Sequence, residues 1–195
     1  ILAIFSGLLG VCIALSLSNF LINFNLHSKY VEILSIFILA TSPIVMGTGL
    51  FLFLRPIINL EILTPILVIL INATMSLPFM LRIILPALTK VNDDTGKLSD
   101  SLNIKGFDRF KLITFPTIFP AISFSTGLGC ALSMGDLGVI TLFSFGDFQT
   151  LPLAIFRLMM SYKMDYAFSS SVLLIIICFS LFQLFDSLGK FHASR

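Results

Sequence analysis

The sequence predicts an all-α integral membrane protein with about five transmembrane helices and a charged helix-turn-helix hairpin between two of them. Of its 195 residues, 57% are hydrophobic and only 11% are charged, and the mean hydropathy is +1.05. A soluble domain carries about 25% charged residues, because its core needs a polar shell. This chain has too few polar residues to form such a shell, so we expect it to be surrounded by lipid.

Five segments are apolar over about 20 residues, the length that an α-helix needs to cross the hydrocarbon core of a bilayer. Backbone polar groups find no water in lipid, so we expect each spanning segment to be helical. The second to fourth segments contain repeated proline and glycine, which predicts bent helices packed closely against neighbours. In chain order, the expected spans are residues 1–20, 31–54, 62–88, 116–145 and 166–185.

We expect one membrane domain over residues 1–195, because no repeat, linker or low-complexity tract divides the chain. The net charge of +2 is too small to indicate nucleic-acid binding. The three cysteines are dispersed in apolar runs, which indicates neither a disulfide framework nor a metal site. The chain begins at Ile1 inside an apolar run, so we expect a piece of a longer protein.

The distribution of lysine and arginine predicts the orientation, because cytoplasmic loops are enriched in both. An odd number of spans places the two ends of the chain on opposite sides. The richer side contains Lys29, Lys90, Lys97, Lys105, Arg109, Lys111, Lys190 and Arg195, and the poorer side contains Arg55, Arg157 and Lys163. The hairpin and the C-terminus are therefore predicted to be cytoplasmic.

The charged hairpin covers residues 93–115, and its pattern predicts two short helices. Helix formers fill residues 93–101, Asn103 is suited to a helix end, and Gly106 lies at the corner before a second short helix. Apolar side chains next to charges on a soluble hairpin favour docking into a groove of a partner. The alternative is a solvated loop at the membrane surface.

A second candidate site is the segment Ser133-Met134-Gly135-Asp136-Leu137-Gly138. A carboxylate in an apolar span is costly and usually faces a water-filled pathway or a partner. We therefore consider Asp136 a candidate pathway or gate residue. A structural cap bonded to the neighbouring backbone is the alternative.

The hairpin sequence SLNIKGFDRFKLITFPTIFPAI resembles the cytoplasmic coupling loop of ABC importer permeases, the EAA motif. The chain departs from that motif in having Lys97-Leu98-Ser99 in place of Glu-Ala-Ala, and Asn103 in place of glycine. The resemblance implies a type I permease fold whose loop docks into a dimer of ABC ATPase subunits. The docking residues that it implies are Asp100, Ser101, Leu102, Asn103, Ile104, Gly106, Phe107, Arg109 and Phe110.

The downstream sequence LSMGDLGVITLFSFGDFQTLPLAIFRLMMSY is similar to the corresponding region of bacterial thiamine permeases. This similarity implies transport of thiamine or its phosphates across the bacterial inner membrane by alternating access. It also implies two further partners, a periplasmic solute-binding protein and another permease half, fused or separate. In that family this chain would be most of the second half without its first helix. The implied pathway or gate residues are Ser133, Gly135, Asp136, Gly138 and Asp147.

The chain lacks the motif that binds ATP, because Thr95-Gly96-Lys97-Leu98 has neither the first glycine nor the final hydroxyl residue of a P-loop. No zinc-protease or nucleophile-elbow motif occurs either. We therefore expect no cofactor and no catalysis in this polypeptide, with ATP bound by a partner subunit. The alternatives are a permease for ferric iron, sulfate or a polyamine, and a membrane scaffold that transports nothing.

Overall fold

The computed structural model describes residues 1–24, 28–56, 60–101, 106–142 and 150–193, and all regular secondary structure in these ranges is helical. This confirms the predicted all-α class. The elements are α1 (Leu2–Asn23), α2 (Ser28–Ala40), α3 (Pro43–Leu54), α4 (Leu60–Ser101), α5 (Gly106–Arg109), the π-helix η1 (Phe110–Thr114), α6 (Phe115–Gly135), α7 (Gly138–Leu142), α8 (Leu151–Met160) and α9 (Met164–Ala193).

Four helices in the described ranges are long and apolar enough to cross a membrane, and α2 with α3 makes a fifth if this bent pair is one span. The predicted first, third and fifth spans correspond to α1, α4 and α9. The predicted second span is two helices that meet at 81°. The bend falls where Thr41 and Ser42 leave the helix and Pro43 begins the next one, a position at which proline needs no N–H partner.

The hairpin differs from its prediction, because each of the two predicted short helices is continuous with a neighbouring long helix. Residues 93–101 continue α4, which runs unbroken for 42 residues. On the other side of the hairpin, α5, η1 and α6 follow one another without a gap from Gly106 to Gly135. The π-helix ends at Thr114, two residues before Pro116, whose ring would clash with the carbonyl of Leu112 in a regular α-helix.

The predicted fourth span also ends earlier than expected. Helix α6 stops at Gly135, Asp136 is extended with φ −78° and ψ 116°, and the short helix α7 follows. The end of the predicted span, from residue 143 to 145, lies outside the described residues.

Helix α4 is the centre of the bundle, because both apolar core clusters contain its side chains. Towards the hairpin, Met80, Leu81 and Ile84 pack with side chains of α1, α2 and α6. Nearer its N-terminus, Leu67 and Ile71 pack with side chains of α7 and α8. Helix α9 lies on the outside against α6 and α8, and none of the 18-residue apolar window in its span is buried.

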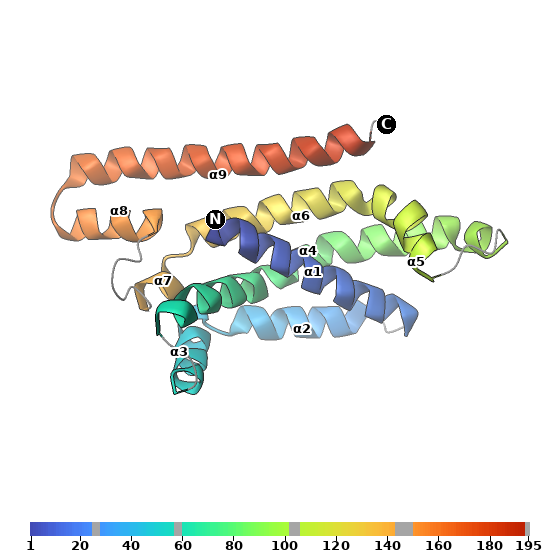
Figure 1. Cartoon of the computed structure of the whole chain (residues 1–195), viewed down its shortest axis with the longest axis horizontal. Coiled ribbons are helices and arrows are strands. Elements are labelled where there is room, and N and C mark those ends of the chain that lie inside the picture. Colours follow the sequence, from blue (N-terminus) through green and yellow to red (C-terminus); the bar gives the residue numbers. More distant parts are fainter. Residues whose placement is uncertain (25–27, 57–59, 102–105, 143–149, 194–195) are drawn as a thin grey trace.

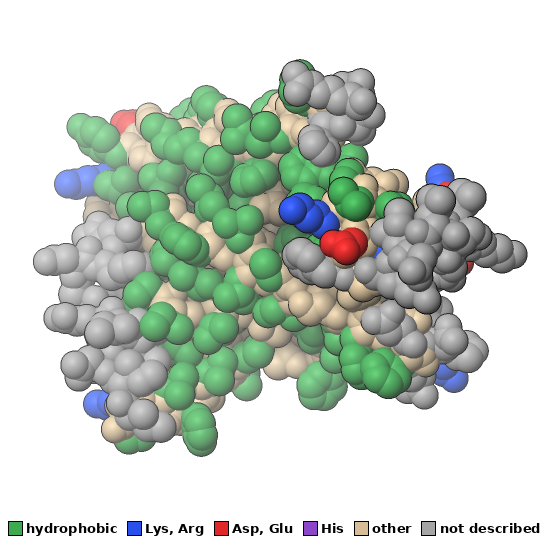
Figure 2. Space-filling model, turned by 45° about the vertical axis from the view of Figure 1, so that its right-hand side comes forward, with side chains coloured by type: hydrophobic (Ala, Val, Ile, Leu, Met, Phe, Trp, Pro, Cys, Tyr) green, Lys and Arg blue, Asp and Glu red, His purple; other side chains and the backbone are tan. Residues whose placement is uncertain are grey.

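The arrangement places the two candidate sites at opposite ends of the molecule. Figure 1 shows α5 and the C-terminus at one end, and α3, α7 and α8 at the other. Among the side chains coloured by type in Figure 2, hydrophobic ones predominate and charged ones are few. This surface agrees with a multi-pass membrane protein. The arrangement also agrees with the prediction that the hairpin and the C-terminus share one side, while the cytoplasmic location of that side remains a prediction.

Candidate functional site

The hairpin end of the bundle is held together by a contact between α5 and α4. The Arg109 guanidinium donates a hydrogen bond from Nη2 to Oδ1 of Asn92 at 2.8 Å. Gly106 is the first residue of α5 and has a φ of +61°, a left-handed backbone conformation that residues with a side chain rarely adopt. This left-handed corner turns the chain so that Arg109 can reach back towards α4.

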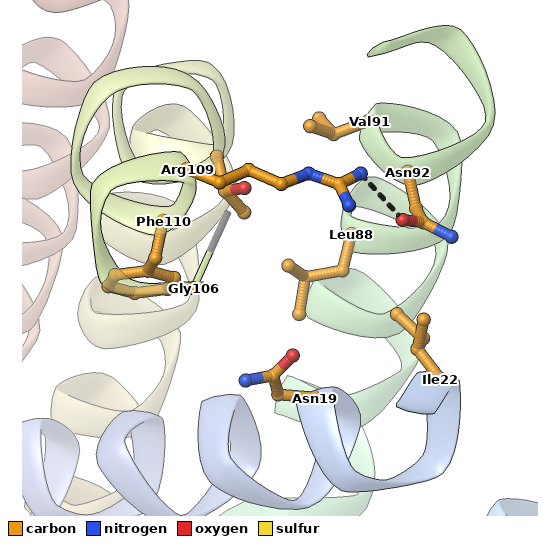
Figure 3. A pocket seen from close by; sticks show the side chains of 9 residues that line it. Asn19, Ile22, Leu88, Val91, Asn92, Gly106, Arg109 and Phe110 are labelled. Carbon is orange, nitrogen blue, oxygen red and sulfur yellow. Dashed lines mark hydrogen bonds between the residues drawn. The ribbon is translucent and has the colours of Figure 1, made fainter. Parts of the chain in front are cut away.

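A cavity of about 550 Å³ lies between α1, α4 and the start of the α5–η1–α6 helix. Figure 3 shows the Arg109 side chain extending across it towards Asn92, with Phe110 and Leu88 on its walls. The cavity leaves room beside the π-helix, none of whose residues is buried. This end of the helix is therefore anchored by a polar contact and loosely surrounded.

The structure describes only part of the predicted docking set. Asp100 and Ser101 end α4, while Gly106, Phe107 and Arg109 lie in α5 and Phe110 begins η1. Leu102, Asn103 and Ile104 lie outside the described residues. Asn92 was not predicted, and its position just before the hairpin in a helix-forming segment gave no signal of a contact 17 residues away.

At the opposite end of the bundle, Asp136 occupies the break between α6 and α7. Its Oδ1 accepts a hydrogen bond from the backbone N–H of Gly138 at 2.9 Å. Asp136 follows the last residue of the candidate span Phe110–Gly135. Burial raises the pKa of its carboxyl, and hydrogen bonds from the N–H groups of Gly138 and Val139 act in the opposite direction. The cap that we considered for Asp136 is thus present.

Next to this break, the buried side chains of Asn72 and Ser133 join α4 to α6. Asn72 Nδ2 donates to Ser133 Oγ at 2.9 Å. The two residues are only 6% and 7% exposed. A buried amide in apolar surroundings is costly unless it is hydrogen-bonded, so this pair fixes the register of the two helices.

The structure thus brings Ser133, Gly135, Asp136 and Gly138 together, whereas Asp147 lies outside the described residues. Asn72 was not predicted as a site residue, although a polar residue in the middle of an apolar span is itself a signal of function. Among the residues described, no group of histidine, cysteine, aspartate or glutamate is arranged to hold a metal ion.

The docking and pathway residues do not meet, but one helix links them. The continuous helix from Gly106 to Gly135 spans about 45 Å at 1.5 Å per residue. This helix therefore joins Arg109 at the hairpin to the break at Asp136.

The sequence of the chain is similar to those of several transport permeases. The chain is 36% identical over 149 residues to the thiamine transport system permease protein ThiP of Brucella abortus, which is 76% of this chain and 27% of that protein. It is 32% identical over 162 residues to ThiP of Salmonella typhimurium (83% and 30%) and 31% identical over 163 residues to ThiP of Escherichia coli (84% and 30%).

A weaker match, 26% identity over 102 residues, links 51% of the chain to 36% of the sulfate transport system permease protein CysW of Synechococcus elongatus. No protein-family model matches the chain. The chain spans about three tenths of the length of the ThiP proteins that it matches. The ThiP matches confirm the resemblance seen in the sequence, and the chain is a homologue of part of the permeases of bacterial ABC transporters.

Proposed function

We propose that this chain is part of a membrane-spanning permease subunit that moves thiamine or its phosphates across the bacterial inner membrane. The driving force is ATP hydrolysis in two separate ABC ATPase subunits. A periplasmic solute-binding protein delivers the solute, and another permease half, fused or separate, completes the pathway. The hairpin and the C-terminus face the cytoplasm.

The observation that supports this proposal most strongly is the similarity to ThiP over about four fifths of the chain. So few residues are left outside the longer matches that both the hairpin and the Asp136 segment must lie within them. The two candidate sites therefore belong to the part of the chain that resembles a thiamine permease.

In this mechanism the hairpin receives the movement and the long helix transmits it. ATP binding closes the two ATPase subunits and draws the docked hairpins together. Arg109 and Asn92 tie α5 to α4, so the hairpin moves both helices rather than bending alone. The break at Asp136 then opens the bundle towards the loaded binding protein, and ATP hydrolysis returns it.

The test is uptake of labelled thiamine by cells that lack their own thiamine permease. The complete reading frame that contains this chain is supplied with the ATPase and binding-protein genes from the same source. We expect uptake that depends on all three components. Uptake should fall at least tenfold in an Asp136→Ala variant that accumulates normally, whereas normal uptake by that variant would favour a scaffold without a pathway.

Docking is tested separately by deleting residues 103–110 and asking whether the ATPase still co-purifies with the permease. We expect the ATPase to be lost. The Phe168→Leu variant, which changes an exposed side chain of α9 far from the hairpin, is the control and should retain it. Retention of the ATPase by the deletion variant would show that the hairpin is not the docking element.

The match to a sulfate permease supports a second candidate function, the transport of a small anion. The two candidates predict opposite effects at Asp136, because a carboxylate attracts a cation and repels an anion. The Asp136→Asn variant should lower thiamine uptake but raise sulfate uptake. Sulfate uptake by the unchanged transporter, with none of thiamine, would decide for the anion.

A further inference from the structure

A cavity of about 300 Å³ lies at the Asp136 end of the bundle, between α2, α3, α4 and α6. The break between α2 and α3 forms one wall through Thr41 and Pro43. Asp136 and Ser133 line the side of α6, and Asn72 lines the side of α4. The cavity is therefore a concave site in which a few polar groups converge among apolar walls, the usual form of a small-molecule site.

The polar side chains that line this cavity already make hydrogen bonds within the protein. Asp136 is half-buried, and its Oδ1 is occupied by the N–H of Gly138. Asn72 uses its Nδ2 to contact Ser133, and the side chain of an asparagine also carries a carbonyl acceptor. Ser76 is 2% exposed and donates to the carbonyl of Ala73. A solute in the cavity would thus meet one carboxylate and one amide as its main polar partners.

The charge and the aromatic content of the cavity select a cation. Its described lining contains a carboxylate and no lysine, arginine or histidine. Phe79, from α4, also lines it and is 40% exposed, so its ring is accessible. The carboxylate favours a cation over an anion or a neutral solute, and the accessible ring offers a contact to an organic solute in the same cavity.

We propose that this cavity binds the transported solute as a small organic cation, with Asp136 facing the charge, Phe79 contacting the ring or cation, and Asn72 hydrogen-bonding to the solute. The proposal rests on the proposed transport function and adds the place and the residues of a holding site within the permease.

The same amide also separates this cavity from a second one. A cavity of about 440 Å³ on the other side of the Asn72–Ser133 pair is bounded by α1, α8 and α9. Both residues line both cavities. Thr150, which also lines the second cavity, has a buried hydroxyl without a hydrogen-bond partner in the described part of the chain. A solute that replaces Ser133 as the partner of Asn72 removes the contact that divides the two spaces.

The experiment measures whether thiamine protects residue 132 from a thiol reagent. Leu132 lines the cavity, is 42% exposed and has no part in the proposed contacts with the solute. The complete transporter, with ATPase and binding protein, carries Leu132→Cys and is treated with a cationic methanethiosulfonate reagent in the presence and absence of millimolar thiamine. Modification of each cysteine is followed by mass spectrometry of its peptide. We expect thiamine to slow the reaction at residue 132 at least threefold. The control Phe168→Cys, on the exposed face of α9, should react at an unchanged rate.

A second variant tests the amide. Adding Asn72→Leu to Leu132→Cys should abolish the protection while the ATPase still co-purifies, whereas Thr74→Val should preserve it. Thr74 is the matched control because it lies on the same helix and its hydroxyl bonds only to the carbonyl of Leu70 among the described contacts. If the leucine variant does not accumulate, Asn72→Ser replaces it with the same expected loss.

The outcomes separate this proposal from the transport function. Thiamine uptake by the unmodified transporter without protection at residue 132 would overturn the cavity assignment alone. Protection that survives both changes of Asn72 would remove the amide from the site. Absence of thiamine uptake by the unmodified transporter would overturn both the proposed function and this site.

Discussion

The long helix from Gly106 to Gly135 is packed in opposite ways towards its Gly135 end and at its hairpin end. Towards the Gly135 end, Gly129 lies so close to α1 and α4 that an added Cβ would be 3.3 Å from the Cα of Gly7 and 2.2 Å from the Cε of Met80. Gly127 is similarly close to α9, where the Cβ of Phe185 would be 3.0 Å away. Three helices therefore approach the same stretch of backbone.

The hairpin end of this helix is packed loosely by comparison. None of the π-helix residues is buried, and the cavity beside them measures about 550 Å³. A single described hydrogen bond, from Arg109 to Asn92, joins the start of this helix to α4. Three helices thus pack closely against this helix near Gly127 and Gly129. Its hairpin end, which the proposed function would move, is packed loosely and has one described hydrogen bond to α4.

The difference reflects how helices associate in lipid. Lipid chains are as apolar as leucine, so burial of apolar surface between helices gains little there, and close van der Waals packing of small residues takes its place. Gly7 and Gly129 provide this packing. A segment that must follow a partner in water needs the reverse, with few tight contacts and a polar anchor that can reorient.

The largest expected effect comes from filling the tight crossing. Gly129→Leu would place a branched side chain where the backbone of α1 and the side chain of Met80 already lie. Overpacking costs about 1–3 kcal/mol when neighbours can shift and more when they are backbone. We expect the variant to lose most of its folded, ATPase-binding protein, as judged by size-exclusion chromatography in detergent.

Gly49→Leu is the matched control, because no atom lies within 4 Å of a Cβ built on this glycine in α3. It should accumulate like the unchanged protein. Equal loss of both variants would mean that leucine in a span is harmful by itself, and the contrast between the two regions would lose its support.

A smaller effect is expected from the anchor of the hairpin. Arg109→Ala and Asn92→Leu each remove the hydrogen bond between α5 and α4, which is partly exposed to water. A hydrogen bond of this kind contributes about 1 kcal/mol net. Each change should therefore weaken ATPase binding roughly fivefold, measured as the ATPase concentration that gives half-saturation of the permease in proteoliposomes.

The double variant decides whether the two side chains act together. If Arg109 and Asn92 act through their contact, combining both changes should weaken binding no more than either change alone. Lys111→Ala is the control for loss of a positive charge, since Lys111 is exposed in η1 and lies outside the lining of the cavity. Additive losses in the double variant would show that Arg109 contacts the ATPase directly.

The sequence predicted helices well where a segment is uniformly apolar. It predicted them poorly at the hairpin, where charged residues and prolines suggested helix ends within segments that are helical. Helices α1 and α9 lie close to their predicted bounds, because long apolar runs leave no other structure in lipid. The hairpin was predicted as two separate helices because charge and proline usually punctuate structure. In the molecule the charged residues of 93–101 are good enough helix formers to extend α4, and a π-turn accommodates Pro116.

The candidate sites show a second limit of sequence reasoning. Asp136 stood out because an acidic residue in an apolar run is conspicuous. Asn72 stood out less, and its partner Ser133 is 61 residues away, so only the packing of α4 on α6 brings them together. The short helix α7 was missed because five residues are too few to establish a helical period.

The smallest effect is expected outside both regions, at the ion pair between Asp186 and Lys190 on α9. The lysine side chain is 75% exposed, and an exposed pair at this spacing contributes about 0.3–0.5 kcal/mol. Lys190→Met should leave the midpoint of thermal unfolding, measured in detergent, within about one degree. Gly189→Leu is the neighbouring contrast, because its Cβ would lie 3.1 Å from the Cα of Pro120 in α6, and it should lower the midpoint clearly. If the lysine variant unfolded as readily as the glycine variant, the close approach of α9 to α6 at Gly189 would contribute no more to stability than this ion pair within α9.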